Sequence, residues 1–147
     1  MPEENKLRVV IDTNLLISAA LVANSPPDKL IRAWLKKEFI LIISLEQLEE
    51  IRDVSKRKKF KARPLFTKSI TELIENIKYV AETMEPLSKK NLPLHVRDIE
   101  DDFMIAAALG GDADYLITGD EDLLMLNGNP LLGKLRIISA RDFLKIL

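Results

Sequence analysis

Four acidic residues from separate parts of the chain stand where carboxylates can bind a metal ion. Asp12 ends the apolar run RVVIDTN, Asp120 follows the strand-like YLITG, Asp102 opens the helical stretch DDFMIAAAL, and Glu50 lies on a predicted helix between them. Open α/β proteins bind ligands in the crevice outside the carboxyl ends of their strands. Carboxylates gathered there repel one another unless they share a proton or a cation. The pattern predicts divalent-metal binding and phosphate chemistry.

Asp102 is singled out by its helical phase. Ile105, Ala106 and Leu109 lie three, four and seven positions later, so Asp102 shares a face with residues that should pack on the sheet. An ionised carboxylate is costly to bury unless it is paired or bound to a metal. The alternative is a helix cap, because RDIEDDF offers four acids at a helix start.

The other acids also have structural alternatives. Asp12 could cap the following helix, although Asn14 could fill that role equally well and free Asp12. Asp120 could be a turn residue, and either Asp120 or Asp122 could face the crevice. Glu50 could be a solvated helical residue, although Ile51 places it nearer the buried edge than its neighbour Glu49.

The joint placement of these acids at strand ends favours a functional role. A cluster of oxygen ligands without His or Cys selects Mg²⁺ or Mn²⁺ over zinc. Such ions hydrolyse phosphodiesters without a protein nucleophile, because they activate water and stabilise the leaving oxygen. Hydrolysis of a phosphodiester is therefore the chemistry that we predict.

Composition and length set the context for this site. We expect residues 1–147 to form a single domain, because 147 residues with 47% apolar content can bury one good core. The chain has no cysteine, which excludes disulfides and thiolate chemistry, and its net charge of −1 requires any nucleic-acid site to be local. No segment is apolar enough to span a bilayer, and the polar start MPEENKL is unlike a signal peptide. We expect a cytoplasmic protein.

The elements that must position the acids alternate along the chain. Strands are predicted at residues 8–11, 39–43, 79–82, 115–118 and 135–138, of which the third could instead be the end of the preceding helix. Helices are predicted at residues 14–22, 28–37, 45–55, 67–78, 101–110, 121–126 and 140–146. This alternation predicts an α/β fold with three αβα layers around a central parallel sheet of about five strands.

The ordered segments RVVIDTN, ISLEQLEEI, DDFMIAAAL and YLITGDEDLL resemble the PIN domain, particularly the VapC-like toxins of prokaryotic toxin–antitoxin pairs. The resemblance covers residues 7–147 and implies Mg²⁺- or Mn²⁺-dependent endoribonuclease activity, an antitoxin partner and a homodimer. Its catalytic acids fall on Asp12, Glu50, Asp102 and Asp120, and its metal ligands on Asp12, Asp102 and Asp120.

The resemblance also assigns three supporting residues. Asn14 would orient Asp12 or contact water, Thr118 would hydrogen-bond within the acid cluster, and Asp122 would be an additional acid. The adjacent acids at positions 49–50 and 101–102 each leave a choice of one residue.

One segment is densely basic. Residues 56–63, KRKKFKAR, could neutralise the phosphates of RNA, and Phe60 could stack on a base. A solvated charged connector is the alternative. The residues predicted to contact RNA are Lys56, Arg57, Lys58, Lys59 and Lys61.

Two other functions compete with a nuclease. A catalytically silent RNA-binding or scaffold domain would keep the fold, but the intact acid set argues against it. A receiver-type phosphoacceptor would require an acidic pair after the first strand and a late-strand Lys, whereas Asp12 is followed by Thr13 and Asn14. We therefore predict a metal-dependent ribonuclease, the toxin of a toxin–antitoxin pair.

Overall fold

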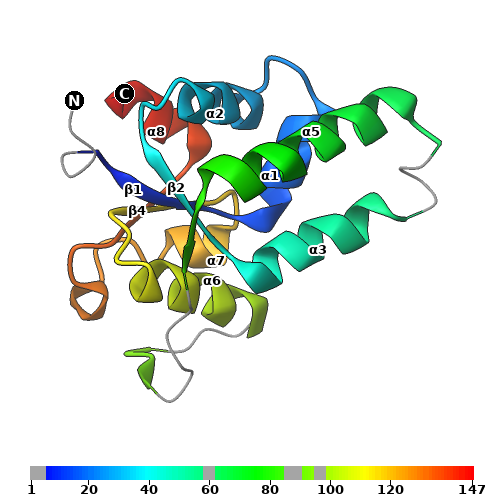
Figure 1. Cartoon of the computed structure of the whole chain (residues 1–147). Coiled ribbons are helices and arrows are strands. Elements are labelled where there is room, and N and C mark those ends of the chain that lie inside the picture. The colour runs from blue at the N-terminus through cyan, green and yellow to red at the C-terminus, as the bar shows by residue number, and fades with distance from the viewer. Residues whose placement is uncertain (1–5, 58–61, 85–90, 95–98) are drawn as a thin grey trace.

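The central sheet is parallel throughout. The computed structural model describes residues 6–57, 62–84, 91–94 and 99–147, and in them five strands form one sheet in the order β3-β2-β1-β4-β5 (Figure 1). The strands are β1 (Arg8–Ile11), β2 (Ile40–Ser44), β3 (Glu82–Met84), β4 (Tyr115–Ile117) and β5 (Arg136–Ile138). Every pairing is parallel, as the alternation of strands and helices predicts.

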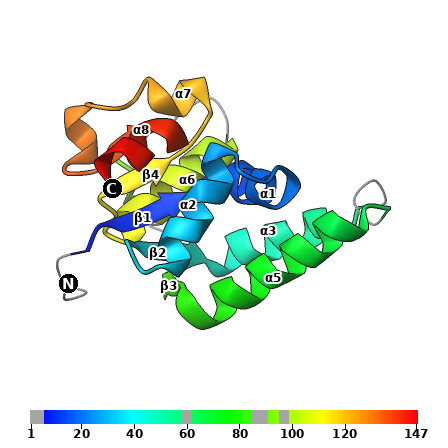
Figure 2. The same cartoon turned by 90° about the horizontal axis from the view of Figure 1, so that it is seen from above.

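Helices cover both faces of the sheet and make three layers (Figures 1 and 2). One core packs beneath α1 (Thr13–Leu21), α2 (Pro26–Leu35), α3 (Leu45–Ser55), α5 (Pro64–Val80) and α8 (Ala140–Ile146). The other packs beneath α6 (Ile99–Gly110), α7 (Glu121–Leu124) and the 3₁₀ turn η3 (Pro130–Leu132). Successive strand residues alternate between the two cores, because Val9 and Ile11 face the first and Val10 faces the second.

The third strand differs from the sequence prediction. Residues 79–82 were expected to form it, but α5 continues to Val80 and β3 begins at Glu82. Ile70, Leu73 and Ile77 keep one buried helical face, whereas the Tyr79 side chain is 83% exposed. A strand through Tyr79 would break that face, so the helix continues and the strand starts later.

Two prolines set helix starts earlier than expected. Helix α2 begins at Pro26 rather than at residue 28, because Ser25 caps it by accepting a hydrogen bond from the Asp28 amide. Helix α5 begins at Pro64 rather than at residue 67. Proline suits a first helical position, since the amide hydrogen that it lacks has no partner there.

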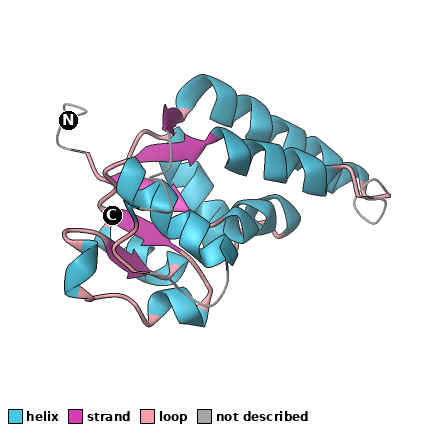
Figure 3. Ribbon diagram, turned by 90° about the horizontal axis from the view of Figure 1, so that it is seen from below, coloured by secondary structure: helices cyan, strands magenta, loops and turns pink. Residues whose placement is uncertain are grey.

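Helices α3 and α5 pack side by side and project beyond the sheet (Figures 2 and 3). Lys56 and Arg57 follow the last residue of α3, and Arg63 precedes α5. All three side chains are exposed. Basic residues therefore lie at the outer end of this helical pair.

The amino-terminal edge of the sheet is held together by opposite charges. Arg8 bonds Glu82 at 2.8 Å and also donates to the carbonyl oxygen of Gly111. Lys134 lies 3.1 Å from Asp112 and 3.4 Å from Asp114. Its hydrogen bond to Asp112 is the main reason why the pKa of Lys134 is raised above its ordinary value, and Asp114 acts in the same direction. Each of these acids has a protein cation beside it.

The described helices give no sign of a membrane segment. In the part of the chain with assigned structure, none combines the length and apolar character that a crossing requires.

Phe143 of α8 should contribute strongly to stability. Its side chain is fully buried and meets Phe39 and Tyr115 edge-to-face, with ring centroids 5.3 Å apart in each pair. Phe143→Ala should lower the free energy of unfolding by about 3–5 kcal/mol, because it removes a large buried ring and leaves a cavity. Urea denaturation measures the change. Ile146→Ala, half exposed on the same helix, is the control and should cost far less; equal losses would contradict the assigned packing.

Candidate metal centre

The strand order places a topological switch point between the carboxyl ends of β1 and β4, the position at which open α/β sheets have a ligand-binding crevice. After β1 the chain moves to β2 and β3, then returns to place β4 on the other side of β1. The connections therefore diverge at the β1–β4 boundary, which is where ligands bind in open α/β sheets. Asp12 directly follows β1, and Thr118 and Asp120 follow β4. Topology alone brings these residues to one place.

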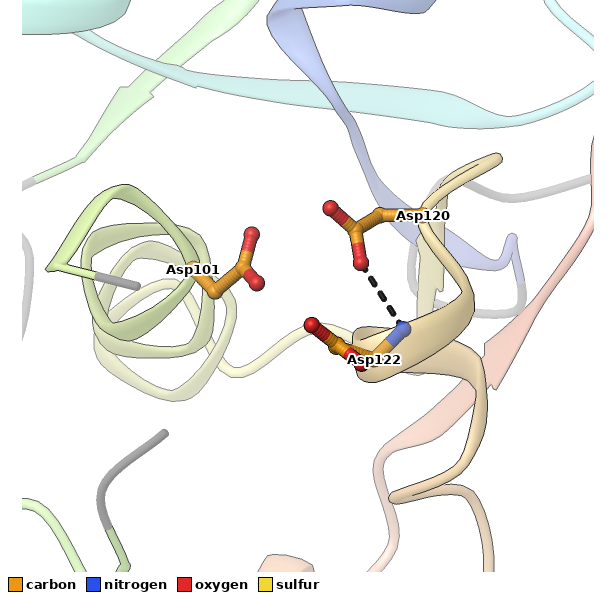
Figure 4. A group of neighbouring side chains, drawn as sticks. All are labelled: Asp101, Asp120 and Asp122. Carbon is orange, nitrogen blue, oxygen red and sulfur yellow. Dashed lines mark hydrogen bonds between the residues drawn. The ribbon is translucent and has the colours of Figure 1, made fainter. Parts of the chain in front are cut away.

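Three carboxylates converge beside this crevice. One oxygen each of Asp101, Asp120 and Asp122 lies within 4.8 Å of the other two (Figure 4). Asp101 comes from the start of α6 and is only 6% exposed, whereas Asp120 is half-buried and Asp122 exposed. Because oxygen ligands lie about 2.0–2.6 Å from Mg²⁺ or Ca²⁺, oxygens at these separations can surround one cation.

A buried threonine connects the acid of β1 to the acid of β4. Thr118 is fully buried, and its hydroxyl donates to Asp12 Oδ2 at 2.8 Å. The Thr118 hydroxyl oxygen in turn accepts a hydrogen bond from the Asp120 amide at 3.0 Å. Thr118 therefore links the Asp12 carboxylate to the backbone of Asp120 through two hydrogen bonds.

Both strand-end acids also cap helices. Asp12 Oδ1 accepts the Asn14 amide at 3.1 Å and caps α1, so the cap is Asp12 itself and not the alternative Asn14. Asp120 Oδ1 accepts the amides of Asp122 at 2.8 Å and Leu123 at 3.3 Å and caps α7. Each cap fixes the carboxylate, and the cap and a cation do not exclude one another, because a carboxylate offers about four lone-pair sites.

The structure brings the neighbour of one predicted metal ligand into the group of three. Asp102 was predicted to join Asp120, but the residue in the group of three is Asp101. Asp102 is buried, at 7% exposed, as its phase indicated. Residues three, four and seven positions after Asp101 are equally apolar, so phase could not separate the two. The closeness of Asp101 to α7 is a tertiary feature without a signal in the sequence.

The remaining predicted residues lie outside this group. Asp12 is connected to Asp120 of the group by the two hydrogen bonds of the Thr118 hydroxyl. Glu50 is an exposed residue of α3. Asn14 contributes its backbone amide, while its side chain is exposed. Lys56 and Arg57 lie at the outer end of α3, whereas Lys58, Lys59 and Lys61 fall outside the described residues. Asp122, predicted only as an addition, is a full member of the group.

The two edges of the sheet differ in how their acids are neutralised. At the amino-terminal edge, Arg8 and Lys134 pair with the acids. At the carboxyl edge, no Lys or Arg of the described ranges forms an ion pair with Asp12, Asp120 or Asp122. Neighbouring carboxylates without protein cations are the arrangement that a bound metal ion stabilises.

Comparison with known families decides what kind of domain holds this crevice. Residues 8–122 match the model of the PIN domain. The chain belongs to the PIN domain family. PIN domains are generally nucleases that use divalent metal ions, and the matched region of this PIN domain contains Asp12, Asp101, Asp120 and Asp122.

A solved structure shares the fold. A chain in the crystal structure of VapBC2 from Rickettsia felis, bound to a DNA fragment from its promoter, superposes on this PIN domain with a TM-score of 0.58. The alignment covers 90% of this chain and 98% of that chain at 16% sequence identity. No curated protein sequence matches the chain. At this identity the similarity shows the three-layer fold, which the alternation of strands and helices predicted.

Replacing Thr118 should test the link between the strand-end acids. Thr118→Val keeps the shape but leaves Asp12 Oδ2 and the Asp120 amide each without the hydroxyl. We expect a loss of about 1–3 kcal/mol in the free energy of unfolding, because buried polar groups would lose their partner. Urea denaturation reports it. The exposed Thr71→Val, which removes a hydroxyl bonded to the Thr67 carbonyl oxygen, is the control and should change stability by less than about 0.5 kcal/mol. An equally small effect at Thr118 would contradict the link.

Proposed function

We propose that the chain is a Mg²⁺- or Mn²⁺-dependent endoribonuclease and the toxin of a toxin–antitoxin pair. The observation that supports this most is the group Asp101, Asp120 and Asp122 at the β1–β4 crevice of a PIN domain. The acids lie close enough to share one cation, and none of the ion pairs described for the chain neutralises Asp120 or Asp122.

The residues of the crevice would divide the work. Asp101, Asp120 and Asp122 would hold the metal, and their hard oxygens suit Mg²⁺ or Mn²⁺. Such an ion lowers the pKa of bound water and stabilises charge on a scissile phosphate. Asp12, held by Asn14 and Thr118, would lie alongside to bind the metal or orient the attacking water. The protein then needs no nucleophile of its own.

Glu50 and Asp102 keep supporting places in this proposal. Helix α3, which carries Glu50, begins directly after Ser44 at the carboxyl end of β2. It therefore leaves the sheet from the same edge at which Asp12 and Asp120 lie. Asp102 is buried beside Asp101 at the start of α6. We therefore assign Glu50 and Asp102 to the surroundings of the site. The metal ligands that we propose are the group of three, Asp101, Asp120 and Asp122.

Two further observations support RNA as the proposed substrate and an antitoxin as the proposed partner. Lys56 and Arg57 are exposed at the outer end of the α3–α5 pair, where cations can contact a phosphate backbone without neutralising the acids. The fold matches a chain of a VapBC2 complex. By analogy we propose an antitoxin partner, a homodimer and a cytoplasmic site of action.

Asp101→Asn should remove metal binding and activity. The substitution keeps the size of the side chain but removes a ligand charge from the group of three. We expect the Mn²⁺ affinity and the cleavage rate of single-stranded RNA to fall by about 100-fold or more, because even outer-shell changes around metals cost about 10–100-fold. Calorimetry measures the first, and a gel assay over RNA and DNA panels measures the second. Growth arrest on expression of the wild type, absent in the variant, would support the toxin assignment.

Two matched variants make this experiment decisive. Asp53→Asn, an exposed acid of α3, should leave both affinity and rate unchanged. Asp102→Asn should reduce them less than Asp101→Asn does; the reverse order would assign the ligand to Asp102. RNA binding without metal-dependent cleavage by the wild type would favour a silent RNA-binding domain. Cleavage of DNA alone would refute the choice of RNA.

Reversing charge at the end of α3 should weaken substrate binding. Lys56→Glu with Arg57→Glu should raise the KM for RNA by about tenfold and make it less sensitive to salt, because fewer counterions are released on binding. The kcat should stay near the wild-type value, since neither residue lies in the acid group. Lys29→Glu on α2 with Lys36→Glu at the C-cap of that helix changes the net charge equally and is the control. An equal rise in KM for both double variants would indicate a general charge effect and no local contact.

A further inference from the structure

A buried amide side chain lies directly behind Asp12. Gln47 is the third residue of α3 and only 1% exposed, and it precedes Leu48, Ile51 and Val54, which form the apolar face of that helix. Its backbone amide donates to the Ser44 hydroxyl at 3.1 Å, an ordinary helix cap. The side chain leaves the helix, and its Nε2 donates to the carbonyl oxygen of Ile11.

This bond completes the support of one peptide unit, the one between Ile11 and Asp12. Its carbonyl accepts from Gln47, and its N–H, which belongs to Asp12, donates to the carbonyl oxygen of Ile117 in β4 at 2.9 Å. The last peptide of β1 is therefore held from α3 on one side and from β4 on the other. The plane of that peptide, together with the Asp12 φ angle of −52°, sets the direction in which the Asp12 side chain leaves the backbone.

Strand β2 does not supply this donor itself. It pairs with β1 at Arg8–Ile40 and Val9–Leu41, and after Ser44 the backbone turns into α3. The Gln47 side chain reaches back from that helix to the Ile11 carbonyl. A side-chain amide thus continues the hydrogen bonding of the sheet beyond the end of the strand, at the position where the carboxylate of Asp12 must be placed.

The amide is retained at a cost. Gln47 Oε1 is buried and accepts no hydrogen bond within the part of the chain that the structure describes. A buried acceptor without a hydrogen-bond donor destabilises a fold, whereas a Leu or Met at the same position would bury only apolar atoms. A directional donor is what Gln provides and an apolar residue does not.

We propose that Gln47 is a positioning residue for the metal centre. Its amide fixes the Ile11–Asp12 peptide, Asp12 is bonded to Thr118, and Thr118 is bonded to the amide of Asp120. Gln47 acts through these contacts and touches neither metal nor substrate. The inference rests on the proposed function in one respect, that the acids bind a divalent cation.

The test compares the full-length wild type with Gln47→Met and Gln47→Leu. Both variants remove the donor, and they differ in shape, so a loss common to both reports the missing amide. Three quantities are measured: hydrogen exchange of the Asp12 amide by NMR without metal, Mn²⁺ affinity by electron paramagnetic resonance, and kcat and KM on single-stranded RNA. Leu48→Ala, the adjacent core residue, is the control for loss of packing.

The expected results separate positioning from general destabilisation. In both Gln47 variants the Asp12 amide should exchange about tenfold faster. The amide of Ile137 in β5, which donates to Asn127 Oδ1, is the reference and should exchange at an unchanged rate. The Mn²⁺ dissociation constant should rise by about 10–100-fold and kcat should fall, with KM for RNA unchanged. Leu48→Ala should lose stability and keep its Mn²⁺ affinity.

Failure of this inference can be told from failure of the proposed function. Unchanged exchange at Asp12, or unchanged Mn²⁺ affinity in variants of a wild type that binds Mn²⁺, would overturn the role of Gln47. A wild type that binds no Mn²⁺ would refute the proposed function, and the exchange measurement, which needs no metal, would still decide whether Gln47 holds Asp12. A parallel loss of Mn²⁺ affinity in Leu48→Ala would overturn the role as well.

Discussion

The structure depends on β1 being bonded on both sides up to its last peptide. β1 lies between β2 and β4, and the chain reverses its direction of progress across the sheet there. The end of β1 therefore lies at a topological switch point, where open α/β sheets bind ligands. The Asp12 amide bonds β4, and the Ile11 carbonyl accepts from α3. With that peptide fixed, Thr118 can place one acid relative to another, and carboxylates can be held close despite their repulsion.

The distribution of charge supports the same conclusion. Acids at the amino-terminal edge of the sheet pair with Arg8 and Lys134, and these contacts stabilise the fold without leaving an unmet charge. At the carboxyl edge, Asp12 and Asp120 receive hydrogen bonds from amides and a hydroxyl. Hydrogen bonds orient a carboxylate but add no positive charge. Among the described residues, Asp12, Asp120 and Asp122 take part in no ion pair with Lys or Arg, so a shared cation would lower their mutual repulsion.

Much of this arrangement could be predicted from the sequence, because strand ends follow from apolar runs. RVVI and YLI locate Asp12 and Asp120 directly, and parallel pairing brings them together. Asp101 could not be chosen over Asp102, since α6 is apolar on nearly every side and its rotation is set by packing. The start of β3 depended on whether Tyr79 is buried, which local pattern did not decide. Gln47 shares a helical face with Ile51 and Val54, four and seven positions later, so phase could place it toward the core, but phase could not show which backbone group its amide would bond.

Asp12 and Asp120 each serve the fold and the site at once, and this determines how their substitutions must be interpreted. Each caps a helix through Oδ1. Asn caps about as well as Asp, whereas Ala loses about 1 kcal/mol of capping energy. An Ala variant therefore mixes a loosened helix start with a lost charge. At Asp120 an Asn variant keeps the cap and removes one negative charge from a repelling group, whereas at Asp12 it also replaces the oxygen that accepts from Thr118. Since removing that repulsion stabilises the metal-free protein, a gain in stability together with a loss of cation affinity in the same Asn variant would identify an acid retained for metal binding at the expense of folding.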